Sequence, residues 1–449
     1  MAIRVRESRD LIGARDLIGR GPARGEFFEL IGRMSLLATL ASAFAVGPGC
    51  GDAKETTTSA APSVSAASPD EGKADGDAAE ADDGSAAEAE LRIETFALRS
   101  EKLAAFAGEP VEIIGTLVLP PKWSPEGRYP VNYVVHGFGG SHKQAAMSHG
   151  SKVWQLEKDG VGGPVIHVYL DANHPMGHHV FADSANMGPW GTALVEEYIP
   201  ALEAKFGGAA VPHGRFVSGH SSGGWSSLWL QVDHPDFFGG VWSTAPDPVD
   251  FRHFTGIDVY AWDNMYRDPD GKPVMLMRKG EEFVLSFEEY TRKEVKTKPI
   301  GGQIYSFDAV FSPKGEDGQP KFIFDRETGV IDHSISDAWR AFDIRQKLEA
   351  EWAELGPKLA GKIHITVGTL DTFRLDGAVR LLDAALDGLG SDAQIVYVEG
   401  RSHFDLFDPD AELYPQGYRA RALEEMWKAW EAGEAGDAGQ ADDAAAAAQ

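Results

Sequence analysis

A serine flanked by glycines lies in the middle of the chain, in the segment Gly219-His-Ser221-Ser-Gly223. An apolar run over 215–219 precedes it and a helical pattern over 221–234 follows it, so this serine stands where a strand turns into a helix. A serine hydroxyl is a weak nucleophile unless such a turn exposes it beside a base, and the sharp turn needs small residues two positions before and after. The spacing therefore predicts Ser221 as the nucleophile of an acyl-transfer reaction.

Two loops further along the chain carry the groups that would activate this serine. Asp371 follows the apolar run 363–367, and His403 follows the run 394–398. In this chemistry the histidine accepts the serine proton, and the carboxylate holds the imidazole in the required tautomer. Asp376 is the second candidate for the acid, although its place at the start of a helical pattern is also explained by helix capping.

A glycine-rich loop, His136-Gly-Phe-Gly-Gly140, follows another apolar run at 131–136. Oxyanion charge that develops during acyl transfer needs backbone N–H donors that are already in place. We expect the N–H groups of Phe138 and Ser222 to be these donors, and a tight turn without a ligand is the alternative interpretation of the loop. Four further side chains are expected to border the substrate: His136, His220, Asn186 and Trp190.

Strand-like and helix-like segments alternate between residues 91 and 430. Apolar, β-branched runs bounded by turn residues cover 111–119, 131–136, 164–170, 215–219, 239–243, 363–367 and 394–398. Helical patterns cover 189–206, 221–234, 336–354, 376–389 and 415–430. This alternation predicts an α/β fold with a mostly parallel sheet and helices on both faces, in which the loops at the carboxyl ends of the strands share one edge. The predicted serine, acid and histidine therefore converge at that edge.

The stretch 247–335 breaks the alternation. It has few periodic elements and several turn signals, but it contains too many aromatic residues for a disordered linker. We expect an ordered, cap-like insertion within the domain. A substrate-binding lid and an irregular surface excursion with its own small core are both compatible with this pattern.

The first fifty residues have the features of an export signal. An apolar run over 35–46 follows Arg33 and ends shortly before Cys50, the single cysteine of the chain. The run is too short to span a bilayer but suits the apolar part of a signal peptide. The segment resembles a bacterial lipoprotein signal, which implies lipidation of Cys50, secretion across the inner membrane and anchoring in the cell envelope. An ordinary cleaved signal peptide is the alternative.

The flanks of the predicted domain at 91–430 have low-complexity compositions. Residues 51–90 contain eleven acidic side chains and no aromatic one, which predicts a disordered tether, and the Ala-, Gly- and Asp-rich tail at 431–449 is expected to be disordered as well. The formal net charge is −27, and the domain itself keeps about −15 of it. An acidic body repels phosphate backbones, which argues against nucleic acid as a partner.

Residues 110–245 and 360–410 resemble the esterase branch of the α/β hydrolases, which includes S-formylglutathione hydrolases, feruloyl and acetyl-xylan esterases, and enterochelin esterases. The similarity lies in the loop 136–140, the segment Trp190-Gly-Thr-Ala-Leu-Val-Glu-Glu-Tyr-Ile-Pro200, the turn 219–223, and the loops of Asp371 and His403. It implies an α/β-hydrolase fold and a serine carboxylic-ester hydrolase that forms an acyl-serine intermediate on a small or polymer-borne ester.

Three alternatives remain beside this interpretation. A peptidase or an acyltransferase would use the same residues, and a surface-binding lipoprotein would keep the scaffold without activity. A metal site could be suggested by a cluster of histidines and acids, but the segment lacks the helical spacing that presents ligands on one face, so neither a metal nor an organic cofactor is expected. The cluster consists of His174, His178 and His179, with Asp171 or Asp183.

Overall fold

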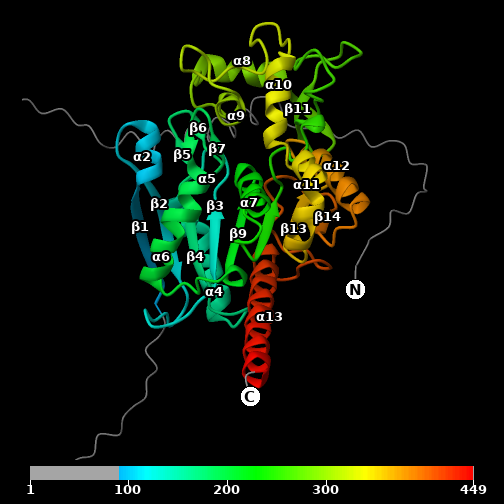
Figure 1. The fold of residues 1–449 in the computed structure, drawn as a ribbon. Helices are drawn as coiled ribbons and strands as arrows, with labels where there is room; N and C mark the ends of the chain where they lie inside the picture. Colours follow the sequence, from blue (N-terminus) through cyan, green and yellow to red (C-terminus); the bar gives the residue numbers. More distant parts are fainter. Residues whose placement is uncertain (1–89, 448–449) are drawn as a thin grey trace, which may run out of the picture. The chain divides into compact units, whose positions relative to one another are not determined.

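A computed structural model describes residues 90–447 (Figure 1). The signal region with Cys50 and the tether up to residue 89 lie outside the described residues. Eight strands form one mixed sheet in the order β1-β2-β4-β3-β9-β10-β13-β14. Their bounds are Arg92–Ser100 (β1), Val111–Leu119 (β2), Val131–Val135 (β3), Ile166–Leu170 (β4), Arg215–His220 (β9), Gly240–Thr244 (β10), Ile363–Gly368 (β13) and Gln394–Val398 (β14).

The sheet is parallel from β4 to β14, whereas β1 and β2 are antiparallel to their neighbours. Strands covered on both faces have continuous apolar sequences, and every residue of β4 and β10 is buried. The predicted α/β fold is confirmed, and the seven predicted strands lie within two residues of their observed bounds. The antiparallel strand β1 was not predicted, because its side chains alternate between exposed and partly buried positions at the sheet edge.

Helices follow most of the strands. Their bounds are Glu101–Ala107 (α2), His142–Ala145 (α3), Ser151–Lys158 (α4), Trp190–Ala193 (α5), Ile199–Phe206 (α6), Ser222–Asp233 (α7), Ile344–Leu359 (α11), Leu375–Gly388 (α12) and Tyr418–Ala447 (α13). Helix α7, which follows the predicted nucleophile, is buried along nearly its whole length. Trp225 and Trp229 of this helix stack on each other at 5.3 Å, so both contribute to the core.

The insertion lies beyond the carboxyl ends of the parallel strands (Figure 1). It contains η4 (Phe251–His253), β11 (Met275–Lys279), β12 (Glu282–Ser286), α8 (Phe287–Thr297) and α9 (Gln303–Phe311), and α10 (His333–Trp339) leads out of it. Its interior is an aromatic cluster formed by Phe251, Phe254, Phe307, Phe311 and Trp339. Phe311 also packs on Trp225 of α7 at 5.1 Å, so this cluster is continuous with the main core.

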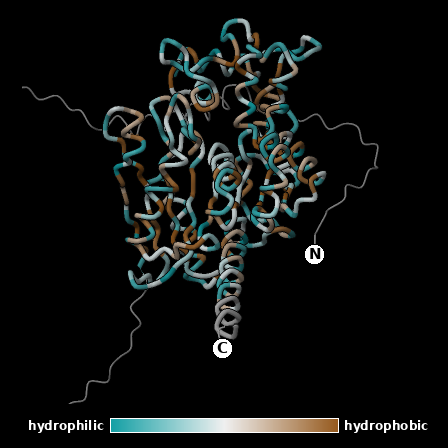
Figure 2. The backbone as a smooth tube through the Cα atoms, in the orientation of Figure 1, coloured by the Kyte–Doolittle hydropathy of each residue, from teal (hydrophilic) through white to brown (hydrophobic). Residues whose placement is uncertain are grey.

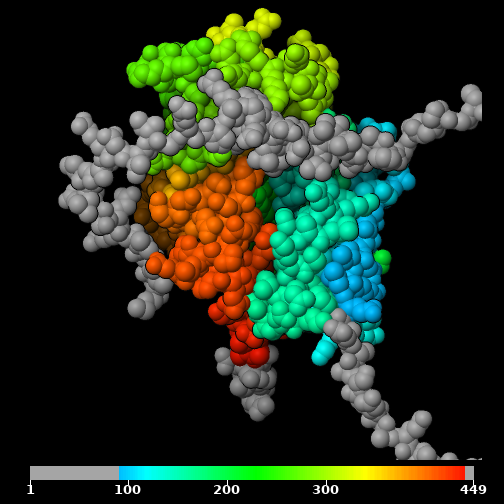
Figure 3. Space-filling model, turned by 180° about the vertical axis from the view of Figure 1, so that it is seen from behind, coloured from blue at the N-terminus to red at the C-terminus, as the bar shows by residue number. Residues whose placement is uncertain are grey.

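The hydropathy colouring follows this arrangement. Hydrophobic segments run through the strands, while the outer loops of the insertion are hydrophilic (Figure 2). From behind, the insertion stands above the part of the domain that contains α12 (Figure 3).

The C-terminal helix differs from the expectation for the tail. The backbone is helical up to Ala447, although the composition of 431–449 predicts disorder. Alanine has the highest helix propensity, and an Ala-rich segment that continues an existing helix needs no new nucleation. Among the described residues, no helix is both long and apolar enough to cross a membrane.

A buried ion pair joins α6 to the sheet and allows a test of the core. The Glu203 carboxylate accepts two hydrogen bonds from the Arg215 guanidinium at 2.9 Å each, and a third from the Tyr133 hydroxyl at 3.1 Å. Glu203→Ala should lower the free energy of unfolding by about 3–5 kcal/mol, because it leaves a buried guanidinium without its counter-charge.

Chemical denaturation of wild type and variant measures this change. The matched control is Asp270→Ala, which removes a surface pair with Lys272 whose two side chains are 74% and 72% exposed. This control should leave the unfolding midpoint unchanged. Equal midpoints for Glu203→Ala and the control would contradict the structural role of the buried pair.

Candidate active site

Ser221 stands at a strained turn between β9 and α7. Its backbone angles are φ 60° and ψ −123°, a conformation that L-residues adopt only when their surroundings enforce it. A Cβ atom at Gly219 would lie 2.1 Å from the carbonyl oxygen of Gly223, and one at Gly223 would lie 2.0 Å from the carbonyl oxygen of Val135. Both positions therefore admit only glycine, and the turn holds the half-buried serine at the carboxyl edge of the sheet.

Neighbouring loops fix this turn through the backbone. The Ser221 N–H donates to Thr244 at the end of β10, and the Asp247 N–H donates back to the Ser221 carbonyl. On the other side, a Cβ at Gly137 would lie 3.3 Å from the Ser221 Cβ, so the glycine-rich loop contacts the serine directly. The Ser222 N–H begins α7, and the first N–H groups of a helix have no acceptor within the helix.

The predicted acid and base form a hydrogen-bonded pair. His403 Nδ1 lies 2.8 Å from Asp371 Oδ2, and both residues are buried. The other carboxylate oxygen of Asp371 accepts hydrogen bonds from the N–H groups of Phe373 and Leu375, which orient it. The His403 ring lies 4.4 Å from the ring of His220, the residue that precedes the serine. Loops that are far apart in the chain thus bring this pair next to the turn.

A carboxylate that was not predicted also faces the serine. The Ser221 hydroxyl donates to Asp247 Oδ1 at 3.4 Å, and the Ser222 hydroxyl donates to Asp247 Oδ2 at 2.5 Å. Burial raises the pKa of Asp247 to about 6. The hydroxyl of Ser221 is therefore bonded to Asp247 and not to His403. Asp247 follows β10 at its carboxyl end, so the rule that selected Asp371 and His403 could have found it.

The side chains that were expected to border the substrate have other contacts. His136 Nδ1 contacts the Gly137 carbonyl at 2.8 Å, while its Nε2 accepts the Ala172 N–H at 3.0 Å. His220 Nδ1 lies 3.1 Å from the Thr244 hydroxyl. Burial, followed by the effect of the nearby His403, holds the pKa of His220 well below its usual value. Both histidines thus support the loops around the serine.

Asn186 and Trp190 lie in the short turns between β4 and α6. The Asn186 amide donates to the carbonyl groups of Ala309 and Ser312, at the end of α9. The Trp190 ring stacks on His179 at 3.8 Å, and its N–H donates to the Met187 carbonyl. The Asn186 bonds fasten its turn to the insertion, whereas Trp190, at the start of α5, packs within the segment between β4 and α6.

The histidines between positions 174 and 179 mostly contact the backbone. His178 Nε2 lies 2.8 Å from the His136 carbonyl oxygen, and burial lowers the pKa of His178 to about 3. Within the described part of the chain, the side chains close enough to share a metal ion are those of His213, Glu434 and Asp437. They lie near the amino end of β9, at the opposite end of that strand from the serine.

Arg278 of the insertion binds the loop that carries Asp371. Its Nε donates to the Asp371 carbonyl at 2.8 Å, and its Nη2 donates to the Thr369 carbonyl at 3.0 Å and to the Asp376 carboxylate at 2.8 Å. Its backbone N–H donates to the Thr372 carbonyl. Asp376, the second candidate for the acid, is thus the partner of an arginine. One residue of β11 thus fixes the acid loop by four hydrogen bonds, three from its side chain and one from its backbone.

Comparisons with known proteins identify a family and several similar solved structures. Residues 111–408, more than half of the chain, match the model of the Esterase family, which is described as "Putative esterase". No match was found among curated proteins. Similar solved structures include a ferulic acid esterase, with 16% identity, a TM-score of 0.46, and coverage of 76% of this chain and 98% of that one.

Two S-formylglutathione hydrolases are also similar. The one from Agrobacterium tumefaciens has 16% identity and a TM-score of 0.43, covering 76% of this chain and 96% of that one. The one from Staphylococcus aureus has 12% identity and a TM-score of 0.44, covering 75% and 99%.

The sheet, the strained serine turn and the family match together define an α/β hydrolase, an enzyme of the carboxylesterase type. The chain belongs to the Esterase family.

The glycines of the turn allow a direct test of its packing. Gly223→Ala should destabilise the fold by about 3 kcal/mol or prevent folding, because the new methyl group would overlap the Val135 carbonyl and backbone cannot yield as a side chain can. Gly388→Ala, in α12 with nothing within 4 Å of the new Cβ, is the matched control and should stabilise slightly. Thermal unfolding measures the melting temperatures of both variants. An unchanged melting temperature for Gly223→Ala would refute the close packing.

Removing the Arg278 side chain tests whether the insertion supports the acid loop. Arg278→Gln should lower kcat for a short-chain aryl ester at least about tenfold with a smaller change in KM, because a displaced catalytic loop weakens the chemical step more than binding. Arg267→Gln is the control, since it removes another arginine of the insertion that is 45% exposed and paired with Glu288. Equal kcat values for the two variants would contradict the expected role.

Proposed function

We propose that the protein hydrolyses carboxylic esters through an acyl-serine intermediate on Ser221. His403 is the general base and Asp371 orients it, while the N–H groups of Phe138 and Ser222 stabilise the oxyanion. One observation carries this proposal: the buried Asp371–His403 pair lies against His220, immediately beside a serine held in a strained turn. A buried histidine whose Nδ1 is bonded to a carboxylate presents Nε2 as the proton acceptor.

The reaction proceeds in two steps that return the enzyme to its starting state. Ser221 Oγ bonds to the ester carbonyl carbon as its proton passes to His403, and the C–O bond to the alcohol breaks as that proton passes to the leaving oxygen. Water then bonds to the acyl carbon while His403 takes one of its protons, and the bond to Ser221 Oγ breaks as that proton passes from His403 to the serine oxygen. The released products are one carboxylic acid and one alcohol, and no cofactor enters the balance.

The serine hydroxyl must turn to reach the imidazole. In the resting arrangement it donates to Asp247 over 3.4 Å, which is a long and weak hydrogen bond. The staggered rotamers of a serine side chain differ little in energy, so rotation about the Cα–Cβ bond can redirect the hydroxyl. Catalytic hydrogen bonds often shorten only when substrate binds. We therefore infer that the bond to Asp247 is exchanged for one to His403 on binding.

Peptidase or acyltransferase activity would use the same groups. The family match favours ester hydrolysis among these reactions. A binding protein on a silent scaffold is disfavoured by the retention of a turn that only glycines permit, because a binding role gives no reason to keep that strain.

We further propose that the enzyme is exported and anchored in the cell envelope through lipidation of Cys50. The support comes from the apolar run and the cysteine that follows it. Mass determination of the mature protein from its native host distinguishes a lipidated Cys50 from an ordinary cleaved signal.

Ser221→Ala tests the nucleophile. The variant should fold like the wild type but lose at least about 10⁴-fold in turnover of a short-chain aryl ester, because no other group forms the covalent intermediate. A fluorophosphonate probe should label the wild type and not the variant, with the label on Ser221 by peptide mass. Ser218→Ala, which removes a hydroxyl of β9 that donates to Asn132 of β3, is the control and should keep full labelling. Retained turnover in Ser221→Ala would overturn the proposal.

A further inference from the structure

Asp247 is a buried carboxylate that has no lysine or arginine partner in the part of the chain that the structure describes. It is 5% exposed, and its side chain accepts hydrogen bonds from the hydroxyls of Ser222 and Ser221. Charged groups that are withdrawn from water are normally paired with an opposite charge or bound to a ligand. A carboxylate in this position therefore indicates a site for a group that the free protein does not supply.

The cationic side chains that surround the site have other partners. Arg278 is bonded to Asp376, and Arg374 donates to the Met275 carbonyl. Lys298 lies 5.3 Å from the centre of the Phe138 ring. Arg278 thus contacts the acid loop, Arg374 contacts the insertion, and Lys298 contacts the glycine-rich loop. None of them forms an ion pair with Asp247 within the described residues.

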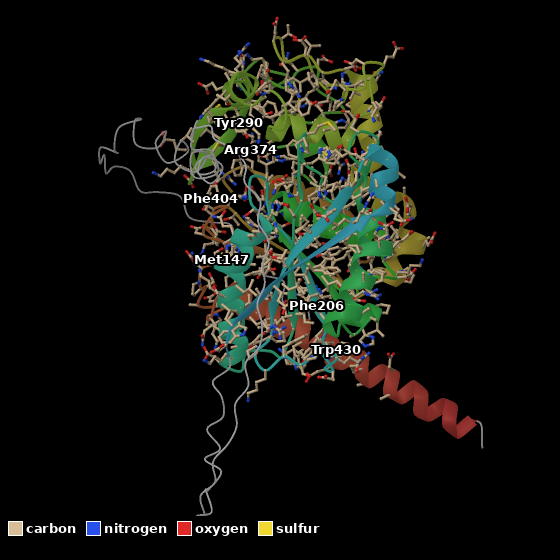
Figure 4. The ribbon with its side chains drawn as sticks, turned by 90° about the vertical axis from the view of Figure 1, so that its left-hand side faces the viewer. Met147, Phe206, Tyr290, Arg374, Phe404 and Trp430 are labelled. Carbon is tan, nitrogen blue, oxygen red and sulfur yellow. The ribbon has the colours of Figure 1, made fainter. Side chains whose placement is uncertain are left out.

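The remaining groups near Asp247 do not neutralise it permanently. His403 is cationic only while it holds the serine proton, and Asp371 has the same sign of charge. Tyr290 of α8 is neutral, and the charge of Asp247 contributes to raising its pKa. Tyr290, Arg374 and Phe404 lie on the same side of the domain (Figure 4).

Acylation of the serine makes the loss of this bond lasting. The acyl-serine has no O–H group, so Asp247 Oδ1 cannot regain the Ser221 hydroxyl, the only donor that it has among the described residues. A buried acceptor that is left without a donor is strongly unfavourable. In the intermediate, the donor must therefore come from the acyl group or from bound water.

On the basis of the proposed function, we propose that Asp247 binds a positively charged nitrogen of the acyl group, one or two carbons from the ester carbonyl. Asp247 Oδ1 lies 3.4 Å from the oxygen that bonds to the carbonyl carbon. An acyl chain directed toward Asp247 can therefore bring an ammonium group on either of the next two carbons within hydrogen-bond distance, about 2.8 Å. An ammonium supplies the missing donor and also the missing charge, whereas a hydroxyl supplies the donor alone. The substrate class is thus esters of short amino acids.

Three aryl esters with acyl chains of matched length test this inference. They are the phenyl esters of 3-aminopropanoate, 3-hydroxypropanoate and butanoate, which end in an ammonium, a hydroxyl and a methyl group. The wild type should have a kcat/KM about 10- to 100-fold higher for the amino ester than for butanoate, the range expected for a charged hydrogen bond. Asp247→Asn should bring this ratio close to one. Asp263→Asn, which removes a fully exposed carboxylate of the insertion, should leave the ratio as in the wild type.

The outcomes separate this inference from the proposed function. Turnover of butanoate without preference for the amino ester would overturn the role of Asp247 and leave the proposed esterase activity in place. A preference for the hydroxy ester, or an unchanged ratio in Asp247→Asn, would have the same meaning. Absence of turnover for all three esters above the Ser221→Ala blank would overturn both. If circular dichroism shows that Asp247→Asn does not fold, Asp247→Glu replaces it. The longer side chain should move the substrate preference to the shorter aminoacetate ester. An unchanged preference would refute the inference.

Discussion

Close backbone contact at the turn of Ser221 is the constraint on which the site depends. Three segments meet there without intervening side chains, because Gly219, Gly223 and Gly137 have no Cβ. The resulting φ of 60° at the serine is held by hydrogen bonds to the end of β10 on one side and by the glycine-rich loop on the other. This packing fixes the start of α7, and with it the position of the Ser222 N–H relative to the serine oxygen. The register of β3, β9 and β10 and the geometry of the reactive centre are therefore parts of one arrangement.

Much of this could be predicted from the sequence, because buried parallel strands have continuous apolar runs and because loops at their carboxyl ends share an edge. That rule places Asp371 and His403 together from the sequence alone. It did not select Asp247, since an aspartate in the segment Ala245-Pro-Asp-Pro248 has the composition of an ordinary turn. Arg278 could not be predicted, because its partners are backbone carbonyls about ninety residues away. The helical backbone of the tail is not predicted, because a low-complexity composition is typical of disorder. The edge strand β1 is not predicted, because alternation between exposed and half-buried residues is a weak signal.

The two carboxylates around the serine differ in what surrounds them. Asp371 is bonded to an imidazole and to two backbone N–H groups. Asp247 has hydroxyl groups as partners and a pKa raised to about 6 by burial. These two acids have different proposed tasks, and their different partners are consistent with that division. The sheet supplies both from adjacent strands, β10 and β13, so the difference arises from the loops that cover them.

The bonds from Arg278 to the acid loop bear on how this enzyme could be redesigned. Insertions of this kind are attractive units for exchange between related hydrolases, since they occupy one continuous stretch of chain. Here β11 binds the backbone of residues 369–372 and the side chain of Asp376, which follow β13 in the main sheet. A chimaera that takes the insertion from another enzyme would lose these hydrogen bonds, and the loop that carries Asp371 would be held less firmly. Graft boundaries must therefore enclose the loop after β13 together with the insertion.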